Sequence, residues 1–211
     1  MQDESTDKKL NILDAAENLF SRNGFDATST RDIADRAGVN VAMISYYFGS
    51  KENLLLAIIE RFSTEILSIL KGSFREEDPI SDRLKKLIDS YLTFSFNHPD
   101  PIIIAHRELG VNMRPVLRSV IQVTYSQARD LVNKIITDGQ KAGIYRQIDQ
   151  TLLIQAIGSM VDNMVIEMHT FKRSNVDMCA LNLIDIGDED SLKKVKDFVL
   201  EITERFLKVD N

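Results

Sequence analysis

The sequence predicts an all-α fold. Apolar residues recur three or four positions apart along almost the whole chain, and no segment shows the apolar and polar alternation of a half-buried strand. Only 9 Gly and 4 Pro interrupt 211 residues, so long helices are possible. Hydrophobic residues make up 44% of the chain, which is enough to fill a core. We therefore expect about nine helices in a compact protein.

The first part of the chain divides at residues that stop helices. Asn23-Gly24 and Gly72 are typical helix ends, because glycine and asparagine tolerate the left-handed conformation found there. The apolar spacing between these stops predicts helices over residues 7–22, 30–37, 41–47 and 51–71.

The second part predicts five longer helices joined by short polar breaks. Their ranges are 80–97, 101–110, 115–142, 148–172 and 190–208. Pro79, Pro101 and Pro115 are expected at helix starts, where a missing N–H costs nothing. Residues 173–189 show no clear period and predict a loop or a partly ordered insertion.

Composition excludes several classes of protein. No apolar run is long enough to span a bilayer, and the first nine residues are polar, unlike a signal peptide, so we expect a cytoplasmic protein. The lone Cys179 excludes an intramolecular disulfide, and no Cys/His spacing predicts a metal site. No phosphate-binding loop or catalytic arrangement is present, so we expect neither a cofactor nor enzyme activity.

The formal net charge of −6 argues against a protein that coats nucleic acid through bulk positive charge. Acidic side chains also outnumber basic ones within residues 1–55. Any binding to DNA must therefore come from local geometry.

Residues 30–44 meet the steric demands of two short helices that cross steeply. Ala34 supplies a small side chain at the crossing, Gly38 a residue that tolerates positive φ in the turn, and Val39 an apolar plug. Ile33, Ala37 and Ile44 would face a shared core. Ser29 or Thr30 can cap the first helix, Asp32 can complete a capping box from Ser29, and Asn40 can cap the second helix. A helical hairpin without any role in DNA binding would meet the same demands.

The second short helix has an unusual outer surface. Almost no charge remains at its start and outer side, where a solvated helix would carry Lys and Glu; the residues there are Val41, Ala42, Met43, Ser45, Tyr46 and Tyr47. Small apolar groups can contact thymine methyls, and hydroxyls can meet base edges or phosphates. Arg31 and Lys51 flank this surface at helix N-termini, which also favour phosphate.

The segments 24–34, 37–39 and 46–54 together resemble the N-terminal signature of the TetR family of bacterial transcription regulators. The resemblance implies a helix-turn-helix in which Thr30 and Arg31 contact phosphates and bases. It implies base readout by Val41, Ala42, Met43, Ser45 and Tyr46, and phosphate contacts by Tyr47 and Lys51. Ser45 stands where family members often carry tyrosine, so a known operator sequence cannot be transferred. Tyr46 could instead pack partly inward.

The predicted domains are a helix-turn-helix head, residues 1–50, and a helical ligand-binding and dimerisation domain, residues 51–211, with helix 51–71 as a shared connector. The head is too small for a core of its own and must share Leu54, Leu55, Ile58 and Ile59. A tilt of the connector would then move the second short helix, which is a hypothesis for regulation.

Helices 148–172 and 190–208 carry the apolar faces expected of a bundle seam. The resemblance implies that they pair with their mates in a homodimer, although a larger monomeric core would use the same residues. Residues 80–168 are rich in apolar side chains with interspersed polar groups, consistent with a site for a small, largely apolar effector. The expected function is repression at a palindromic operator. The alternative is a helical ligand-binding or protein-interaction module without sequence-specific DNA binding.

Overall fold

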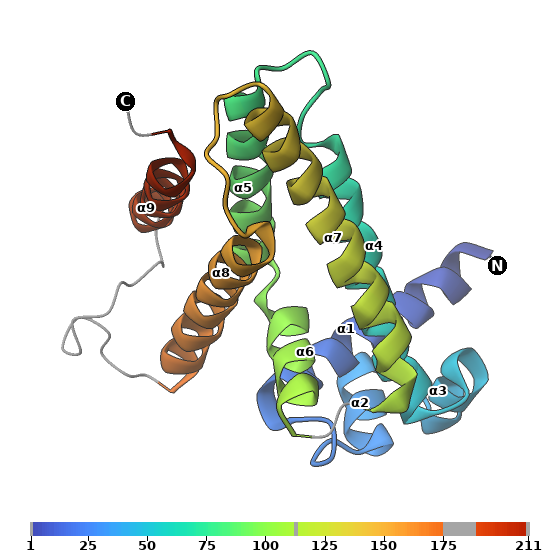
Figure 1. The fold of residues 1–211 in the computed structure, drawn as a ribbon. Helices are drawn as coiled ribbons and strands as arrows, with labels where there is room; N and C mark the ends of the chain where they lie inside the picture. The colour runs from blue at the N-terminus through green and yellow to red at the C-terminus, as the bar shows by residue number, and fades with distance from the viewer. Residues whose placement is uncertain (1, 112–113, 175–188, 210–211) are drawn as a thin grey trace. The chain divides into compact units, whose positions relative to one another are not determined.

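The computed structural model describes residues 2–111, 114–174 and 189–209, and within them it contains nine α-helices and no strand. The predicted all-α fold is confirmed. The helices, labelled in Figure 1, are α1 (Gln2–Asn23), α2 (Thr30–Ala37), α3 (Val41–Phe48), α4 (Lys51–Gly72), α5 (Ile80–Asn97), α6 (Pro99–Val111), α7 (Pro115–Lys141), α8 (Gln150–Arg173) and α9 (Glu189–Leu207). Most of the predicted loop 173–189 lies outside the described residues.

Three helix starts differ from the prediction by two residues or more. Helix α1 begins at Gln2 rather than at residue 7. Helix α6 begins at Pro99, which places Pro101 inside the first turn, where a missing N–H breaks no bond. Helix α8 begins at Gln150 because the Asp149 side chain accepts a hydrogen bond from the Leu152 amide, 3.1 Å away.

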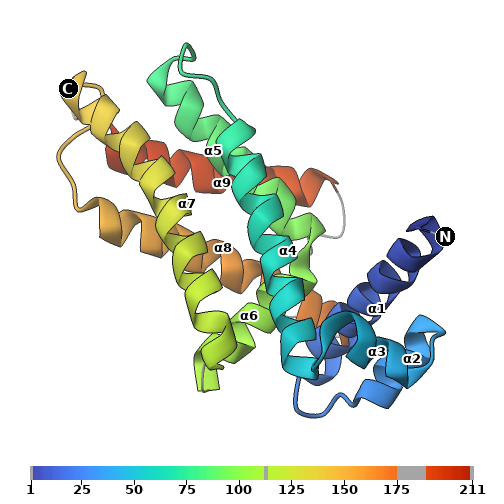
Figure 2. The same cartoon turned by 90° about the vertical axis from the view of Figure 1, so that its right-hand side faces the viewer.

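The chain forms two compact units, each with its own interior. The first consists of residues 1–65 and 100–124. In it α2 packs against both α1 and α3, near the first turns of α4 (Figure 2). Its buried core includes Phe20, Ile33, Ile44, Leu54, Leu55, Ile58, Ile59, Ile104, Leu117 and Ile121. The predicted sharing of the head core with α4 is confirmed, and segment 100–124 adds three further side chains.

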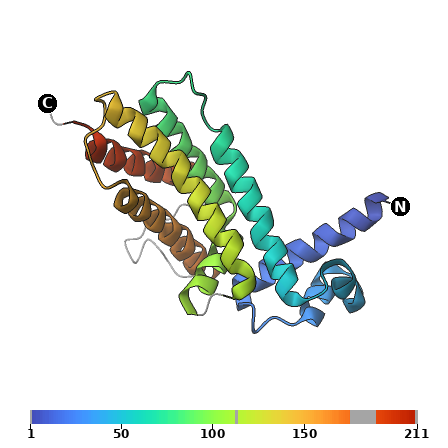
Figure 3. The same cartoon turned by 45° about the vertical axis from the view of Figure 1, so that its right-hand side comes forward.

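The second unit consists of residues 66–99 and 125–211. Here α5 packs against both α8 and α9, and Figure 3 shows these helices together with α7. Val195 and Val199 of α9 are buried, as are Val161 and Val165 of α8. These units divide the chain differently from the predicted domains 1–50 and 51–211, which remain a prediction. Both α4 and α7 continue from the first unit into the second.

Candidate nucleic-acid interface

Helix α2 has a complete cap at each end. The Ser29 hydroxyl accepts a hydrogen bond from the Asp32 amide at 3.2 Å, and the Asp32 carboxylate accepts bonds from the hydroxyl and the amide of Ser29 at 2.6 and 2.9 Å. The bond from the Ser29 hydroxyl and, to a smaller extent, the bond from the Ser29 amide lower the pKa of Asp32 below its ordinary value. Gly38 ends the helix at φ 66°, in the left-handed region that favours glycine. The predicted capping box and turn are confirmed.

Helix α3 follows after a short turn and has its own cap. The Asn40 side chain accepts a hydrogen bond from the Ala42 amide at 2.9 Å, as predicted. Val39 is half-buried and packs against the core of the unit. Ile33 and Ala34 of α2 and Ile44 of α3 are buried, so the two short helices close on one interior.

The outer face of α3 is uncharged and exposed. Tyr46 is 78% exposed and Val41 is 43% exposed, and Ala42 and Ser45 also lie on the surface. The inward packing considered for Tyr46 is wrong. These four side chains offer methyl and hydroxyl groups without any competing charge.

Two of the predicted contact residues on α3 are only partly available. Met43 and Tyr47 are half-buried and pack against the core. The Tyr47 hydroxyl lies 3.0 Å from the Ser5 hydroxyl of α1 and forms a hydrogen bond with it. Their side chains therefore also hold α3 in place. Periodicity alone did not separate these two positions from their exposed neighbours.

The two flanking basic residues differ. Arg31 is exposed and forms no hydrogen bond or ion pair with any described residue, whereas Thr30 beside it is half-buried. The Lys51 ammonium donates hydrogen bonds to the backbone carbonyls of Phe25 and Thr28, at 2.9 and 2.8 Å. It also lies 4.2 Å from the centre of the Phe25 ring. Lys51 is thus tied into the loop between α1 and α2, and its phosphate contact remains a prediction.

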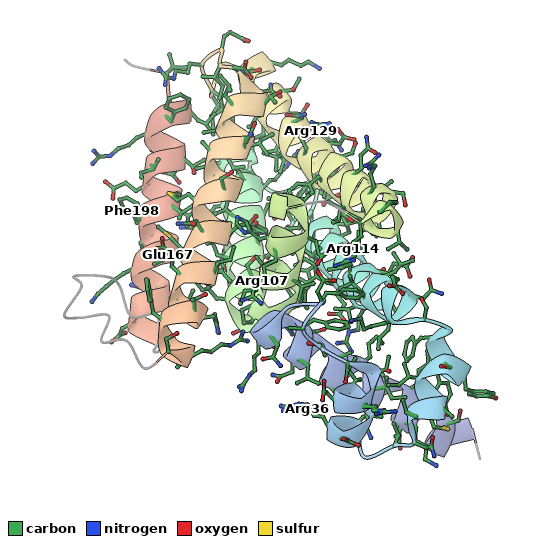
Figure 4. The ribbon with its side chains drawn as sticks, turned by 90° about the horizontal axis from the view of Figure 1, so that it is seen from below. Arg36, Arg107, Arg114, Arg129, Glu167 and Phe198 are labelled. Atoms are coloured by element: carbon green, nitrogen blue, oxygen red, sulfur yellow. The ribbon has the colours of Figure 1, made fainter. Side chains whose placement is uncertain are left out.

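Two arginines that the sequence did not assign to the head belong to this unit (Figure 4). Arg107 of α6 donates to the Ser21 carbonyl at 2.8 Å, near the end of α1 where carbonyls lack helical partners. Arg114 lies 4.0 Å from the centre of the Phe25 ring and pairs with Asp26 at 2.7 Å and Glu108 at 2.9 Å. No sequence signal links them to the head, because their partners Ser21 and Asp26 lie more than 80 positions away.

Helices α8 and α9 of the second unit expose faces of different character. On α9 the exposed large apolar residues are Phe198, Ile202 and Phe206, four positions apart on one face. Along α8 the exposed positions include Ala156 and Ser159, whose small side chains permit close approach of another helix, followed one turn apart by Asn163 and Glu167. Figure 4 labels Glu167 and Phe198 on these two helices.

The second unit also contains a polar group among its helices. The Tyr91 hydroxyl of α5 donates to the Asp162 carboxylate of α8 at 2.7 Å. Burial and this carboxylate raise the pKa of Tyr91 well above its ordinary value. The same two causes raise the pKa of Tyr125, on α7, to about 12. The sequence pattern singled out neither Tyr91 nor Asp162.

Among the described residues, no group of His, Cys, Asp and Glu side chains could hold a metal ion. The same part of the chain includes no helix with the length and apolar character needed to cross a membrane.

Comparison with known proteins identifies both parts of the chain. Residues 12–58 match the family described as bacterial regulatory proteins, tetR family, and residues 77–166 match a tetracyclin repressor-like C-terminal domain. The HTH-type transcriptional regulator RutR of Escherichia coli is 31% identical over 147 residues, which cover 70% of this chain and 68% of RutR.

Solved structures of other proteins share the fold. A tetR-family regulatory protein from Rhodococcus RHA1 matches with a TM-score of 0.76 at 18% identity, covering 97% of this chain and 98% of that one. The regulator FadR from Bacillus subtilis, solved in complex with stearoyl-CoA, matches with a TM-score of 0.71 at 21% identity, covering 93% and 98%. At these identities the likeness shows the fold alone.

Proposed function

Because this chain belongs to the TetR family of bacterial transcriptional regulators, we propose that it is a repressor that binds a palindromic operator as a homodimer and leaves DNA when a small, largely apolar molecule binds. Its family consists of DNA-binding regulators rather than enzymes. A protein with this role would work in the cytoplasm, where its DNA lies.

The uncharged, exposed outer face of α3 is the observation that carries the DNA-binding part of the proposal. Val41 and Ala42 suit thymine methyls, and Ser45 and Tyr46 offer hydroxyls for base edges or phosphates. Met43 would contribute from the inner edge of this face. The two short helices are capped and share one core, so the face is held rigidly by the rest of the head.

Phosphate contacts would come from the residues around this face. Arg31 is exposed and has no protein partner among the described residues, so its guanidinium is available to a phosphate. Thr30, the first residue of α2, and Tyr47 would add hydroxyl groups for phosphates; the Tyr47 hydroxyl lies at the surface, where it forms a hydrogen bond with the Ser5 hydroxyl. Local placement of a few such groups allows an acidic protein to bind DNA, because phosphate contacts act at short range in salt.

Support for the homodimer comes from α8 and α9. Phe198, Ile202 and Phe206 would leave water if a second copy covered them, and the small residues of α8 would let two helices approach closely. A dimer also supplies a second copy of α3. One recognition helix alone reads too few base pairs to be specific for a single site in a genome, and two copies read two half-sites.

The effector part of the proposal rests on the second unit. Its interior is built from apolar side chains, and the Tyr91–Asp162 pair with Tyr125 offers polar groups that can orient a ligand. The structural relative FadR was solved with stearoyl-CoA, a molecule with a long apolar chain. We propose an effector of mixed character for this chain, largely apolar with at least one hydrogen-bonding group.

The deciding experiment is a selection of bound duplexes from a random DNA pool by the purified full chain. We expect an enriched two-fold-symmetric site, preferred over random DNA by about a thousandfold or more, with binding that weakens steeply as salt rises. Failure to enrich any symmetric site would favour the alternative, a helical module without sequence-specific DNA binding. The net charge of −6 is consistent with that alternative.

Variants separate the two kinds of DNA contact. Arg31→Met should weaken binding to all sequences, whereas Ser45→Ala should change which sequence is preferred. Lys85→Met, at an exposed site on α5 with no interaction among the described residues, is the matched control and should leave both unchanged. An unchanged preference in both Ser45→Ala and Met43→Ala would mean that another surface reads the bases.

A further inference from the structure

The Phe25 ring is a meeting point for two cations from distant parts of the chain. The Lys51 ammonium lies 4.2 Å from the ring centre, and the Arg114 guanidinium carbon lies 4.0 Å from it. Both distances are within the range of a cation–π interaction. Phe25 is 6% exposed and both cations are half-buried, so these contacts are partly shielded from water and are stronger than at an open surface.

Each cation has further partners that fix its position. Lys51 donates hydrogen bonds to the Phe25 and Thr28 carbonyls. Arg114 pairs with Asp26 and Glu108, and these carboxylates offset the repulsion between two neighbouring positive charges. The contact therefore consists of a ring, two backbone carbonyls, two cations and two carboxylates within the first compact unit.

This group of contacts adjoins the start of α2. The Thr28 carbonyl, which accepts from Lys51, directly precedes Ser29, the N-cap of α2. Thr28 is itself 1% exposed, and its hydroxyl donates to the Gly24 carbonyl at 2.8 Å. Because α2 packs against α3, a displacement at Thr28 would be passed to the outer face of α3.

The cations also stand at the starts of the two helices that run from the first unit into the second. Lys51 is the first residue of α4, and Arg114 directly precedes Pro115, the first residue of α7. We infer that Lys51 and Arg114 are positioning residues, which set the start of α2 through the Phe25 ring and its loop, and that Lys51 serves DNA binding in this way rather than by a phosphate contact.

The first test measures amide hydrogen exchange in the full chain without DNA. Lys51→Met and Arg114→Met should speed exchange at the Thr28 and Ile33 amides by about tenfold or more, since each variant loses a partly shielded cation contact and its charged hydrogen bonds. Lys85→Met and Arg129→Met are matched controls at exposed sites without interactions among the described residues, and they should leave exchange there unchanged. Wild-type exchange at both amides in both positioning variants would overturn the inference.

The second test, which rests on the proposed function, measures affinity for the selected operator as a function of salt. A lost phosphate contact lowers the slope of log K against log[salt] by about 0.9 for each contact. We expect that loss for Arg31→Met. For Lys51→Met we expect about tenfold weaker binding with the wild-type slope, at a temperature where circular dichroism shows the variant fully folded. A lowered slope in Lys51→Met would show a phosphate contact and overturn the inference.

A third variant guards against loss of folding. Phe25→Leu keeps apolar volume at the site but removes the ring face, so it should reproduce the faster exchange at Thr28 and Ile33 with both cations still present. If wild-type protein bound no DNA sequence, the proposed function would fail, but the exchange measurements would still decide whether the ring and its two cations position α2.

Discussion

The exposed apolar side chains of α3 and those of α9 form two faces that differ in kind. The outer face of α3 offers Val41 and Ala42 beside the hydroxyls of Ser45 and Tyr46. The exposed face of α9 offers Phe198, Ile202 and Phe206, all large and without any polar atom. Mixed small groups suit the edges of bases, whereas large apolar groups suit another protein surface. Exposure alone thus says little until the chemistry of the face is considered.

The largest effect is expected from placing a charge on the α9 face. If the proposed homodimer buries this face, Ile202→Asp should raise its dissociation constant by about a hundredfold or more, because burial of such a side chain contributes about 1.5–3 kcal/mol and two-fold symmetry counts it twice. Sedimentation equilibrium measures this constant. Lys194→Ala, an exposed site on the same helix, is the control. A dimer of unchanged strength would place the interface elsewhere.

A smaller effect is expected from removing the cap of α2. Ser29→Ala should lower the free energy of unfolding by about 1 kcal/mol, because the Asp32 amide loses its acceptor. Urea unfolding of the variant measures the loss, with Ser119→Ala on the exposed side of α7 for comparison. Equal losses in the two variants would argue that the capping box contributes nothing of its own.

The smallest effect concerns acid and the same cap. The pKa of Asp32 is lowered in the folded state, so its contribution to stability is complete above the ordinary value of 3.8 and is lost as pH falls through the lowered value. An NMR titration of the Asp32 carboxyl should therefore give a pKa below 3.8 in the wild type and a higher one in Ser29→Ala. A carboxyl that titrates identically in both proteins would contradict the hydrogen bond that the Ser29 hydroxyl donates to Asp32.

Local features of the fold could be predicted from the sequence. The caps at Ser29 and Asn40 and the left-handed turn at Gly38 depend on residues within a few positions of each other, so their spacing carries the information. The exposed face of α3 was predicted for the same reason, with Val41 and Tyr46 on the surface. The shared core with Leu54 and Leu55 followed from the small size of the head.

Contacts between distant segments could not be predicted in this way. Lys51 looks like a free cation in the sequence, because its carbonyl partners lie on a loop more than 20 positions earlier. The partners of Arg107 and Arg114 are farther still. Helical period likewise places Met43 and Tyr47 near a boundary between faces, and only packing against the core decides their partial burial.

The interleaved make-up of the first unit has a consequence for building hybrid regulators. Ile104, Leu117 and Ile121 complete the same interior as Phe20 and the short helices, although they come from the second stretch of the unit. A gene fusion with its breakpoint after α4 would discard them together with both arginines. A hybrid that takes its second unit from another regulator must therefore keep residues 100–124 together with residues 1–65 of the same parent protein.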